Sequence, residues 1–495
     1  MTELNHTMPQ PPAAPPAQAV PPLRKPWPVE KRERRLLPLS LALSFLLVSF
    51  LLDWMDGQWM RLPGTGITAL TVAWYGALFL YRGTAGMEKR ANRVLLGTVA
   101  LLALTFMLFS NQWFRFWNCG ALGLLIAVHT WELCGGARLP WQEAGMLLER
   151  LWLFIKGPFV CCGALLDTAR SVKQGRNLSR ALPAAIGVLV TVPALWLVSS
   201  VLMDADALFA LVAGNVLGGL EARFGQSLAR LLLAMCVMPF LFSLLYFAAH
   251  TEQPPKAEKA RAGRDPLPAV MLLGALDGLY LLFLAVQSAA LFGDQAYLVR
   301  AGISFAEYAR SGFFQLVGLA GLNVTIILAA VWLCRDSKGL RLLSTALVAL
   351  TTVLLVSAAW RMTLYVGAYG LSFKRLLTYW GMGMLSILLA LTVRKVWKPE
   401  FQFFRTAAPL ALAGWLLLNY ANVDAIAARY NSTQVSAGRL PLSAVENLVY
   451  NNCGYDGLAS CDCGLADSLW LREMAAADCG SWTTWSVSAW RAAKG

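Results

Sequence analysis

The stretch LLPLSLALSFLLVSFLL, residues 36–52, decides the fold of this chain. It contains no charged residue, follows the basic run KRERR (31–35) and precedes Asp53. A helix needs about 20 predominantly apolar residues to cross the hydrocarbon core of a bilayer. Lys and Arg gather on the cytoplasmic side of such helices. The stretch therefore predicts a membrane-spanning helix that enters the bilayer from the cytoplasm.

Similar apolar blocks recur along the whole chain. The protein has 495 residues, of which 57% are hydrophobic and 14% are charged, whereas soluble domains are about 25% charged. About eleven blocks are long enough to span once flanking Trp and Tyr residues are included. They cover residues 36–53, 67–81, 94–109, 117–133, 183–203, 227–249, 267–291, 314–334, 340–360, 376–393 and 406–420. The sequence thus predicts an all-α, polytopic transmembrane helix bundle.

The net charge of +14 follows from the same topology. In a soluble protein it would suggest nucleic acid, but here the basic residues concentrate in alternate loops, so no nucleic-acid partner is expected. The segments that hold most of the Lys and Arg residues are 1–35, 82–93, 134–182, 250–266, 335–341 and 394–405. This alternation predicts a cytoplasmic N-terminus and an extracytoplasmic C-terminus, with the lipid bilayer as the main partner.

Residues 141–172 are the one segment that could reverse this topology. Lys156 and Pro158 interrupt their apolar run. If the segment crossed the bilayer, every later basic loop would face outward. We therefore interpret it as helices on the cytoplasmic surface, apolar side toward the lipid, while entry into the membrane remains the alternative.

Five regions follow from this pattern. They are a Pro-rich disordered cytoplasmic tail (1–35), four spans (36–133), cytoplasmic interfacial helices (134–182), seven further spans (183–420) and an extracytoplasmic Cys-containing tail (421–495). Pro-rich segments favour extended chain. A spacer is the simpler interpretation of the first region, and a docking site for a membrane or cytoplasmic protein is the alternative.

Four cysteines fall in the last region, after the final span. They are Cys453, Cys461, Cys463 and Cys479. Cysteines outside the cytoplasm favour disulfides, so we expect two of them, with three connectivities open. A zinc site is the weaker alternative because the tail contains no His. We expect this tail to be helical and to pack on the outer face of the membrane helices.

The usual catalytic signatures are absent from the sequence. There is no Walker A motif, no GxSxG, no HExxH and no dinucleotide fingerprint, so no cofactor and no metal are expected. The only histidines, His6, His129 and His250, lie outside the predicted exterior segments. Acid–base chemistry at the exterior face would therefore need carboxylates, Tyr, Arg or Lys.

Polar residues within the predicted spans form one candidate site. Asp277 and Gln287 share the seventh span and Asn323 lies in the eighth. Polar residues are costly in lipid and tend to face a bundle interior or a cavity. Asp277 is thus a candidate ion or proton site, and a carboxylate near the interface that pairs with a loop Arg is the alternative.

A second candidate site lies at the exterior ends of the later spans. Its proposed anion-binding residues are Arg300, Arg310, Arg361, Tyr365, Tyr369, Arg375, Asn422 and Arg429, with Glu307 and Asp424 as candidate catalytic carboxylates. Arg binds phosphate and carboxylate in a bidentate manner, which suits a lipid headgroup or a polyprenyl-phosphate ligand. The alternative is an interfacial aromatic belt with ion pairs between loops.

Glu307 has a structural explanation as well. Ser304 and Glu307 stand at the S-x-x-E spacing of a capping box ahead of an apolar run. This spacing predicts a capped helix on the exterior surface, so a catalytic role for Glu307 is the less favoured of the two. Arg300 and Arg310 have no such explanation, and each is expected to face an internal or a bound anion.

Several of these stretches resemble a bacterial family of polytopic inner-membrane proteins that is known as a domain of unknown function. The matching stretches are LYLLFLAVQSAALFG (279–293), RAGISFAEYARSGFFQL (300–316), RMTLYVGAYGLSFKR (361–375) and NYANVDAIAARYN (419–431). The resemblance implies a helical membrane fold in a bacterial cytoplasmic membrane. It implies no reaction, and the four-cysteine tail departs from the family pattern.

Three functions remain open from the sequence. The first is a transferase-like enzyme that acts on a lipid-linked or envelope substrate at the exterior face, with Glu307 or Asp424 as base. The second is a transporter or flippase whose path is lined by Asp277, Gln287 and Asn323, although no inverted repeat is evident. The third is a non-catalytic sensor or assembly partner.

Overall fold

The computed structural model describes residues 29–58, 62–136, 145–173, 226–250, 263–291, 313–445, 455–458 and 468–494, with a few isolated positions between them. These residues form helices and turns, and their only β-type pairing is an isolated parallel bridge between Arg264 and Cys334. The all-α prediction is therefore confirmed for the described part of the chain.

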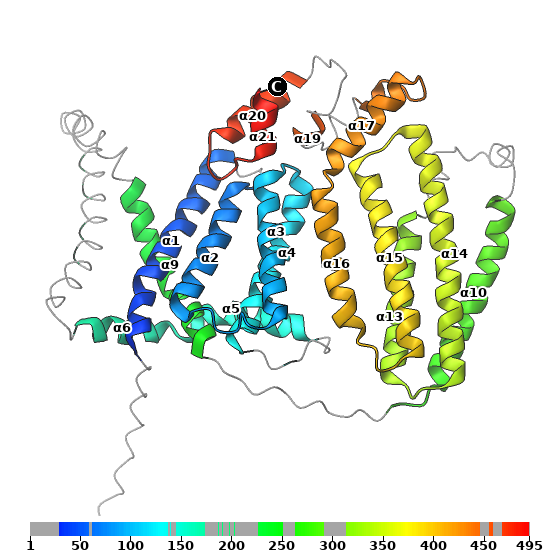
Figure 1. Cartoon of the computed structure of the whole chain (residues 1–495), viewed down its shortest axis with the longest axis horizontal. Helices are drawn as coiled ribbons and strands as arrows, with labels where there is room; N and C mark the ends of the chain where they lie inside the picture. Colours follow the sequence, from blue (N-terminus) through cyan, green and yellow to red (C-terminus); the bar gives the residue numbers. More distant parts are fainter. Residues whose placement is uncertain are drawn as a thin grey trace, which may run out of the picture.

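The long helices run side by side, up and down the bundle (Figure 1). In chain order they are α1 (Lys31–Gln58), α2 (Thr65–Arg82), α3 (Arg90–Leu108), α4 (Gln112–Cys134), α9 (Gln226–His250), α10 (Leu267–Leu291), α13 (Phe313–Leu333), α14 (Lys338–Tyr369), α15 (Phe373–Trp397) and α16 (Phe403–Tyr420). The shorter helices are α5 (Met146–Val160), α6 (Cys162–Lys173), α17 (Val423–Ser436), α19 (Tyr455–Leu458), α20 (Ser468–Cys479) and α21 (Val487–Lys494).

Two groups of helices stand next to each other. The first group, α1 to α6 with α9, packs around a core that includes Phe106, Trp131 and Phe242. The second group, α10 and α13 to α15, packs around Leu273, Ile327 and Leu347. Figure 1 shows α16 between the two groups. The packing thus places α9 with the N-terminal helices rather than with those that follow it in sequence.

Six of the described helices are long and apolar enough to cross a membrane, and two bent helix pairs, α5–α6 and α16–α17, raise the number to eight. The long helices also expose large apolar side chains, such as Val72, Val286 and Leu417, each about two-thirds exposed or more. Soluble proteins rarely expose apolar surfaces of this kind to water, whereas such surfaces are favourable in contact with lipid. The chain is therefore a multi-pass membrane protein.

The predicted count of eleven spans is not confirmed. Ten of the predicted blocks coincide with described long helices, whereas the block 183–203 lies outside the described residues apart from isolated positions. Helix α4 is not among the six helices that are apolar enough to cross a membrane. Its sequence includes polar residues, such as Asn118 and His129, whose side chains are buried against other helices.

The two ends of the bundle differ in charge. We call the end where α1 begins the basic end and the end that carries α17 and α19–α21 the tail end (Figure 1). Described basic residues at the basic end include Lys31, Arg32, Arg34, Arg35, Lys89, Arg90, Arg93, Arg264, Arg335, Lys338, Arg341, Arg394, Lys395, Lys398 and Arg405. The start of α1 and the last helix therefore lie at opposite ends, while the compartment that each end faces stays a prediction.

Helices α5 and α6 meet at a bend of 47°, and α6 lies across the basic end, beneath α1 and α9 (Figure 1). The bend leaves two backbone groups without partners in their own helix. The Ser243 hydroxyl of α9 is the hydrogen-bond partner of both groups. Its Oγ donates to Gly157 O at 2.7 Å and accepts from Cys161 N at 2.8 Å. A side chain at Gly157 would clash with Leu244, which shows how closely α5 and α9 approach.

A buried polar network joins α16 to the first group. Asn118 Nδ2 donates to Asn419 Oδ1 at 2.7 Å and to Thr105 Oγ1 at 3.1 Å, while Asn118 Oδ1 accepts from Trp415 Nε1 at 2.7 Å. Aromatic rings of Trp113, Phe114, Phe373, Trp380 and Trp415 pack around it. One amide thus links three helices, α3, α4 and α16.

Replacing Asn118 by leucine should destabilise the protein by about 1–3 kcal/mol, because three buried partners lose a hydrogen bond at once. Thermal unfolding in detergent would measure the loss. Thr98→Val is the matched control, since the Thr98 hydroxyl donates only within its own helix, to Val94 O. Equal unfolding midpoints for the two variants would contradict the proposed role of Asn118.

Candidate functional site

The tail end of α14 carries one group of predicted site residues. The Tyr365 and Tyr369 rings lie 5.0 Å apart, and the Arg375 guanidinium sits 4.4 Å above the Tyr365 ring. Arg375 also donates to the carbonyl of Tyr369 at 2.9 Å and to that of Gly370. Arg361 is buried one turn below Tyr365. The structure therefore brings two tyrosines and one arginine together at the α14–α15 turn, with a cation–π contact between Arg375 and Tyr365.

The predicted residues of α17 lie elsewhere at the tail end. Asn422 caps the helix with a φ of 51° and accepts from Ala425 N. Asp424 is buried and accepts a 2.8 Å hydrogen bond from Asn111 Nδ2, which itself caps α4. Arg429 is exposed. Asp424 thus contributes to the contact between α17 and α4. Arg300, Glu307 and Arg310 lie outside the described residues.

A polar site lies within the second helix group, about half-way along its helices. Tyr280 Oη donates to Asn323 Oδ1 at 3.1 Å, and Asn323 Nδ2 donates to Thr351 Oγ1 at 2.9 Å. These three side chains are buried and come from α10, α13 and α14. Asp277 lies one turn before Tyr280 on the same face of α10. The side chain of Gln287 lies outside the described residues.

Asp277 differs from the other buried polar residues of this site. Its residue exposure is 6%, and neither carboxylate oxygen has a hydrogen-bond partner among the described residues. The Ser344 hydroxyl of α14 is likewise buried and without a partner there. Leu343, the residue before Ser344, packs close to Gly274, which lies one turn before Asp277 on α10. A Cβ at Gly274 would lie 3.7 Å from the Leu343 side chain. An isolated ionised carboxylate is very costly in such surroundings, so this site can accommodate a proton or a cation.

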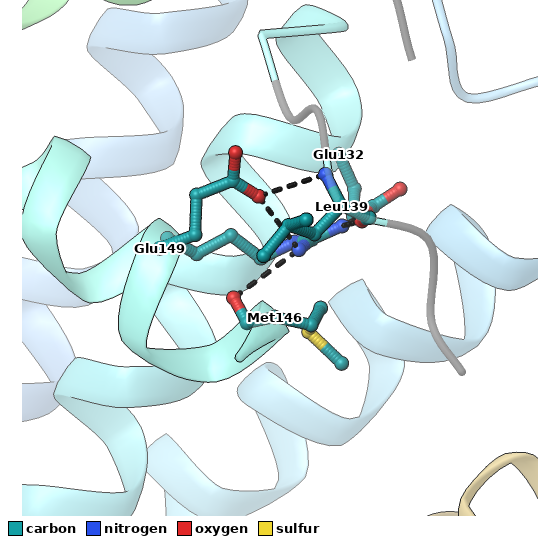
Figure 2. A network of polar contacts seen from close by, with 5 residues as sticks. Glu132, Leu139, Met146 and Glu149 are labelled. Atoms are coloured by element: carbon teal, nitrogen blue, oxygen red, sulfur yellow. Dashed lines mark hydrogen bonds and ion pairs between the residues drawn. The ribbon is translucent and has the colours of Figure 1, made fainter. Parts of the chain in front are cut away.

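Sequence reasoning missed one of the most deeply buried charges among the described residues. Arg150 of α5 is 1% exposed. Its Nε donates to Glu132 Oε1 at 2.9 Å, its Nη1 donates to Met146 O at 3.2 Å and its Nη2 donates to Leu139 O at 3.0 Å (Figure 2). Glu149 lies 3.6 Å from Nη1. The signal available was the Glu149–Arg150 pair inside an apolar run.

The tail is fastened to the membrane helices by hydrogen bonds. Gly64 N donates to Thr483 O at 2.7 Å, Thr65 N donates to Trp485 O at 3.0 Å, and Trp482 Nε1 donates to Asp53 Oδ2 at 2.7 Å. Asp53 also pairs with Arg230 of α9 at 2.5 Å. These contacts fix residues 482–485 against the tail ends of α1, α2 and α9.

A second set of contacts reaches the turn before α4. Ser488 Oγ donates to Asp456 Oδ2 at 2.7 Å and lies 2.9 Å from Ser110 Oγ. Burial raises the pKa of Asp456, against the hydrogen bonds from Ser488 and Asn422, which lower it. Asn422 therefore faces the tail.

The predicted disulfides receive no support. Cys479 has a free thiol, and no two described cysteines are close enough to be bonded. Cys453, Cys461 and Cys463 lie outside the described residues. Spacing in sequence does not fix the Cα separation that a disulfide needs. The described residues also contain no group of three or more His, Cys, Asp or Glu side chains that could hold a metal ion.

The fold and these sites define a class: a multi-pass α-helical membrane protein with a buried polar site in one helix group. Residues 96–458 match the family described as "Domain of unknown function (DUF4153)". Because the match covers well over half of the chain, the protein belongs to this family. No curated protein and no solved structure matches it.

Proposed function

We propose that the protein is a bacterial cytoplasmic-membrane transporter whose second helix group binds a proton or small cation at Asp277. One observation carries the proposal, which is the buried carboxylate without a described partner half-way along α10. Intramembrane carboxylates of this kind are typical of ion and proton pathways. The proposal includes eleven spans, a cytoplasmic basic end and an extracytoplasmic tail end, in keeping with the distribution of Lys and Arg.

The hydrogen-bonded side chains of Tyr280, Asn323 and Thr351 support the assignment. They place hydroxyl and amide groups on the three helices that surround one buried site. Neutral oxygen ligands next to one carboxylate suit a monovalent cation or a proton better than a large anion. Transport of a solute would then be coupled to this site if the solute binds the protein with different affinity when the Asp277 site is loaded and when it is empty.

The replacement Asp277→Asn tests the proposal, because the sign of the resulting change in stability depends on whether the carboxylate is paired. A paired carboxylate should lose about 3–5 kcal/mol of stability when neutralised. An unpaired one should instead gain about 1 kcal/mol or more, because the cost of burying its charge disappears. Thermal unfolding of the purified protein in NaCl, KCl and choline chloride would show this gain. It would also show whether a stabilisation by Na⁺ or K⁺ in the native chain is lost in the variant.

Asp336→Asn is the matched control. Asp336 is an exposed carboxylate that pairs with Arg341 at the basic end, so its loss should change stability by no more than about 1 kcal/mol. A marked destabilisation by Asp277→Asn would contradict the cation site.

The second proposed function is a transferase-like enzyme acting on a lipid-linked anion at the tail end, with Glu307 or Asp424 as base. The stack of Arg375 on Tyr365 favours it, because Arg and Tyr together suit a phosphate-bearing headgroup. Complementation of a deletion strain separates the two functions. Arg375→Gln should abolish complementation if the enzyme is correct, and Asp277→Asn should abolish it if the transporter is correct.

A further inference from the structure

Two side chains of α15 contact the turn between α15 and α16 at the basic end. Lys395 Nζ donates to Pro399 O at 2.5 Å and to Phe401 O at 2.9 Å. The Arg394 guanidinium lies 4.8 Å above the Phe401 ring. Two basic side chains of α15 thus contact this turn, just before the first residues of α16.

An open groove of about 640 Å³ lies beside this turn. Its lining residues are Glu400, Phe401, Gln402, Arg405, Thr406, Pro409 and Leu410. The polar members belong to the turn and the first turn of α16, Phe401 belongs to the turn, and Pro409 and Leu410 lie further along the helix. A helix rises 1.5 Å per residue, so Leu410 lies about 8 Å beyond Arg405 toward the bilayer interior. The groove therefore has polar side chains together with Phe401 at its mouth, and only the apolar side chains of Pro409 and Leu410 at its inner end.

The mouth carries one positive and one negative side chain. Arg405 Nη1 donates to Gln402 Oε1 at 3.0 Å. Neither Arg405 nor Glu400 forms an ion pair with another residue in the described part of the chain. Two opposite charges that are exposed but do not pair with each other complement a ligand that carries both signs.

We propose that this groove binds a phospholipid with a zwitterionic amine headgroup. Arg405 contacts the phosphate, Glu400 contacts the ammonium group, and an acyl chain lies along Pro409 and Leu410. Bidentate binding of phosphate is the usual role of Arg. The position suits a lipid because the turn lies among basic residues, at the depth where headgroups meet water. This proposal is independent of the transport proposal, since it uses none of the residues around Asp277.

Native mass spectrometry of the purified, delipidated full chain tests the proposal. The probes are phosphatidylethanolamine, which carries both charges, and phosphatidylglycerol, which carries only the phosphate. The native protein should bind phosphatidylethanolamine more tightly. Arg405→Gln should weaken both lipids about tenfold, because a charge-assisted hydrogen bond is lost. Glu400→Gln should remove the preference for phosphatidylethanolamine and leave phosphatidylglycerol binding intact.

Lys398→Gln is the control, because Lys398 is exposed in the same turn but does not line the groove. It should bind both lipids as the native chain does. Equal binding of the two lipids by the native protein would overturn the proposal. So would an Arg405→Gln variant that binds like Lys398→Gln, since the bound lipid would then be held by non-specific contact alone.

Discussion

Replacing Arg150 by methionine should lower the free energy of unfolding by about 3–5 kcal/mol, the largest effect expected of any substitution considered for this protein. Removing one partner of a buried ion pair leaves the other as an uncompensated charge. Here Glu132 and Glu149 would both remain near the interior, and the carbonyls of Leu139 and Met146 would lose their donor. Methionine fills a similar volume, so the loss would report on polar contacts rather than on a cavity.

Thermal or denaturant unfolding in detergent would measure this change, with Arg170→Met as the control. Arg170 is an exposed residue of α6 that lies 3.6 Å from Asp167, and exposed pairs contribute at most about 1 kcal/mol. Arg150→Lys should fall between the two, because an ammonium keeps the charge but cannot match the planar fork of a guanidinium. If Arg150→Met were no worse than Arg170→Met, the ion pair would not be a main link between α4 and α5.

Replacing Gly64 by valine should detach the tail from the membrane helices. A Cβ at this position would lie 2.4 Å from Trp485 O and 2.7 Å from Thr484 O. Both are backbone atoms, which cannot rotate away as a side chain can. The φ of Gly64 is −97°, so the effect would come from this contact and not from backbone strain. Loss of the hydrogen bonds to Thr483 and Trp485 should cost about 2–4 kcal/mol of tail docking.

Hydrogen exchange of the backbone amides of residues 481–494 would follow the detachment. Gly76→Val in α2, the helix that begins directly after Gly64, is the matched control, because a Cβ there meets no atom within 4 Å. The Gly64 variant should lose protection throughout the segment while the Gly76 variant keeps it. Equal protection in the two variants would show that the tail can shift and still remain docked.

The sequence allowed the helices to be predicted but not their neighbours. Apolar blocks and basic loops are local properties, so residues 36–53 and 227–249 lie within the helices α1 and α9 that the structure contains. That these two helices pack against each other is not a local property, and no pattern in the sequence indicated it. The number of spans also depends on packing between helices. A helix that buries polar side chains against its neighbours has a less apolar sequence than a helix that faces lipid.

The candidate sites also combine features that are local in the sequence with contacts between helices that are distant in the sequence. Asp277 could be selected from the sequence because a carboxylate within an apolar block is conspicuous. Its lack of a described partner, and the hydrogen bonds among Tyr280, Asn323 and Thr351, depend on three helices that are distant in sequence. Asp424 was selected from the sequence as a candidate catalytic base, but its contact with Asn111 could not be foreseen across more than three hundred residues.

The position of α16 has a mechanical consequence. The hydrogen bonds that join α16 and α17 to the first helix group, those of Asn118 with Asn419 and of Asn111 with Asp424, lie toward the tail end. At the other end, Phe404, Arg405 and Leu410 of α16 are exposed. Because Phe403 and Ala407 of α16 are buried in the core of the second helix group, a substitution beside Asn118 that shifted α16 would also disturb the packing of that group at the basic end.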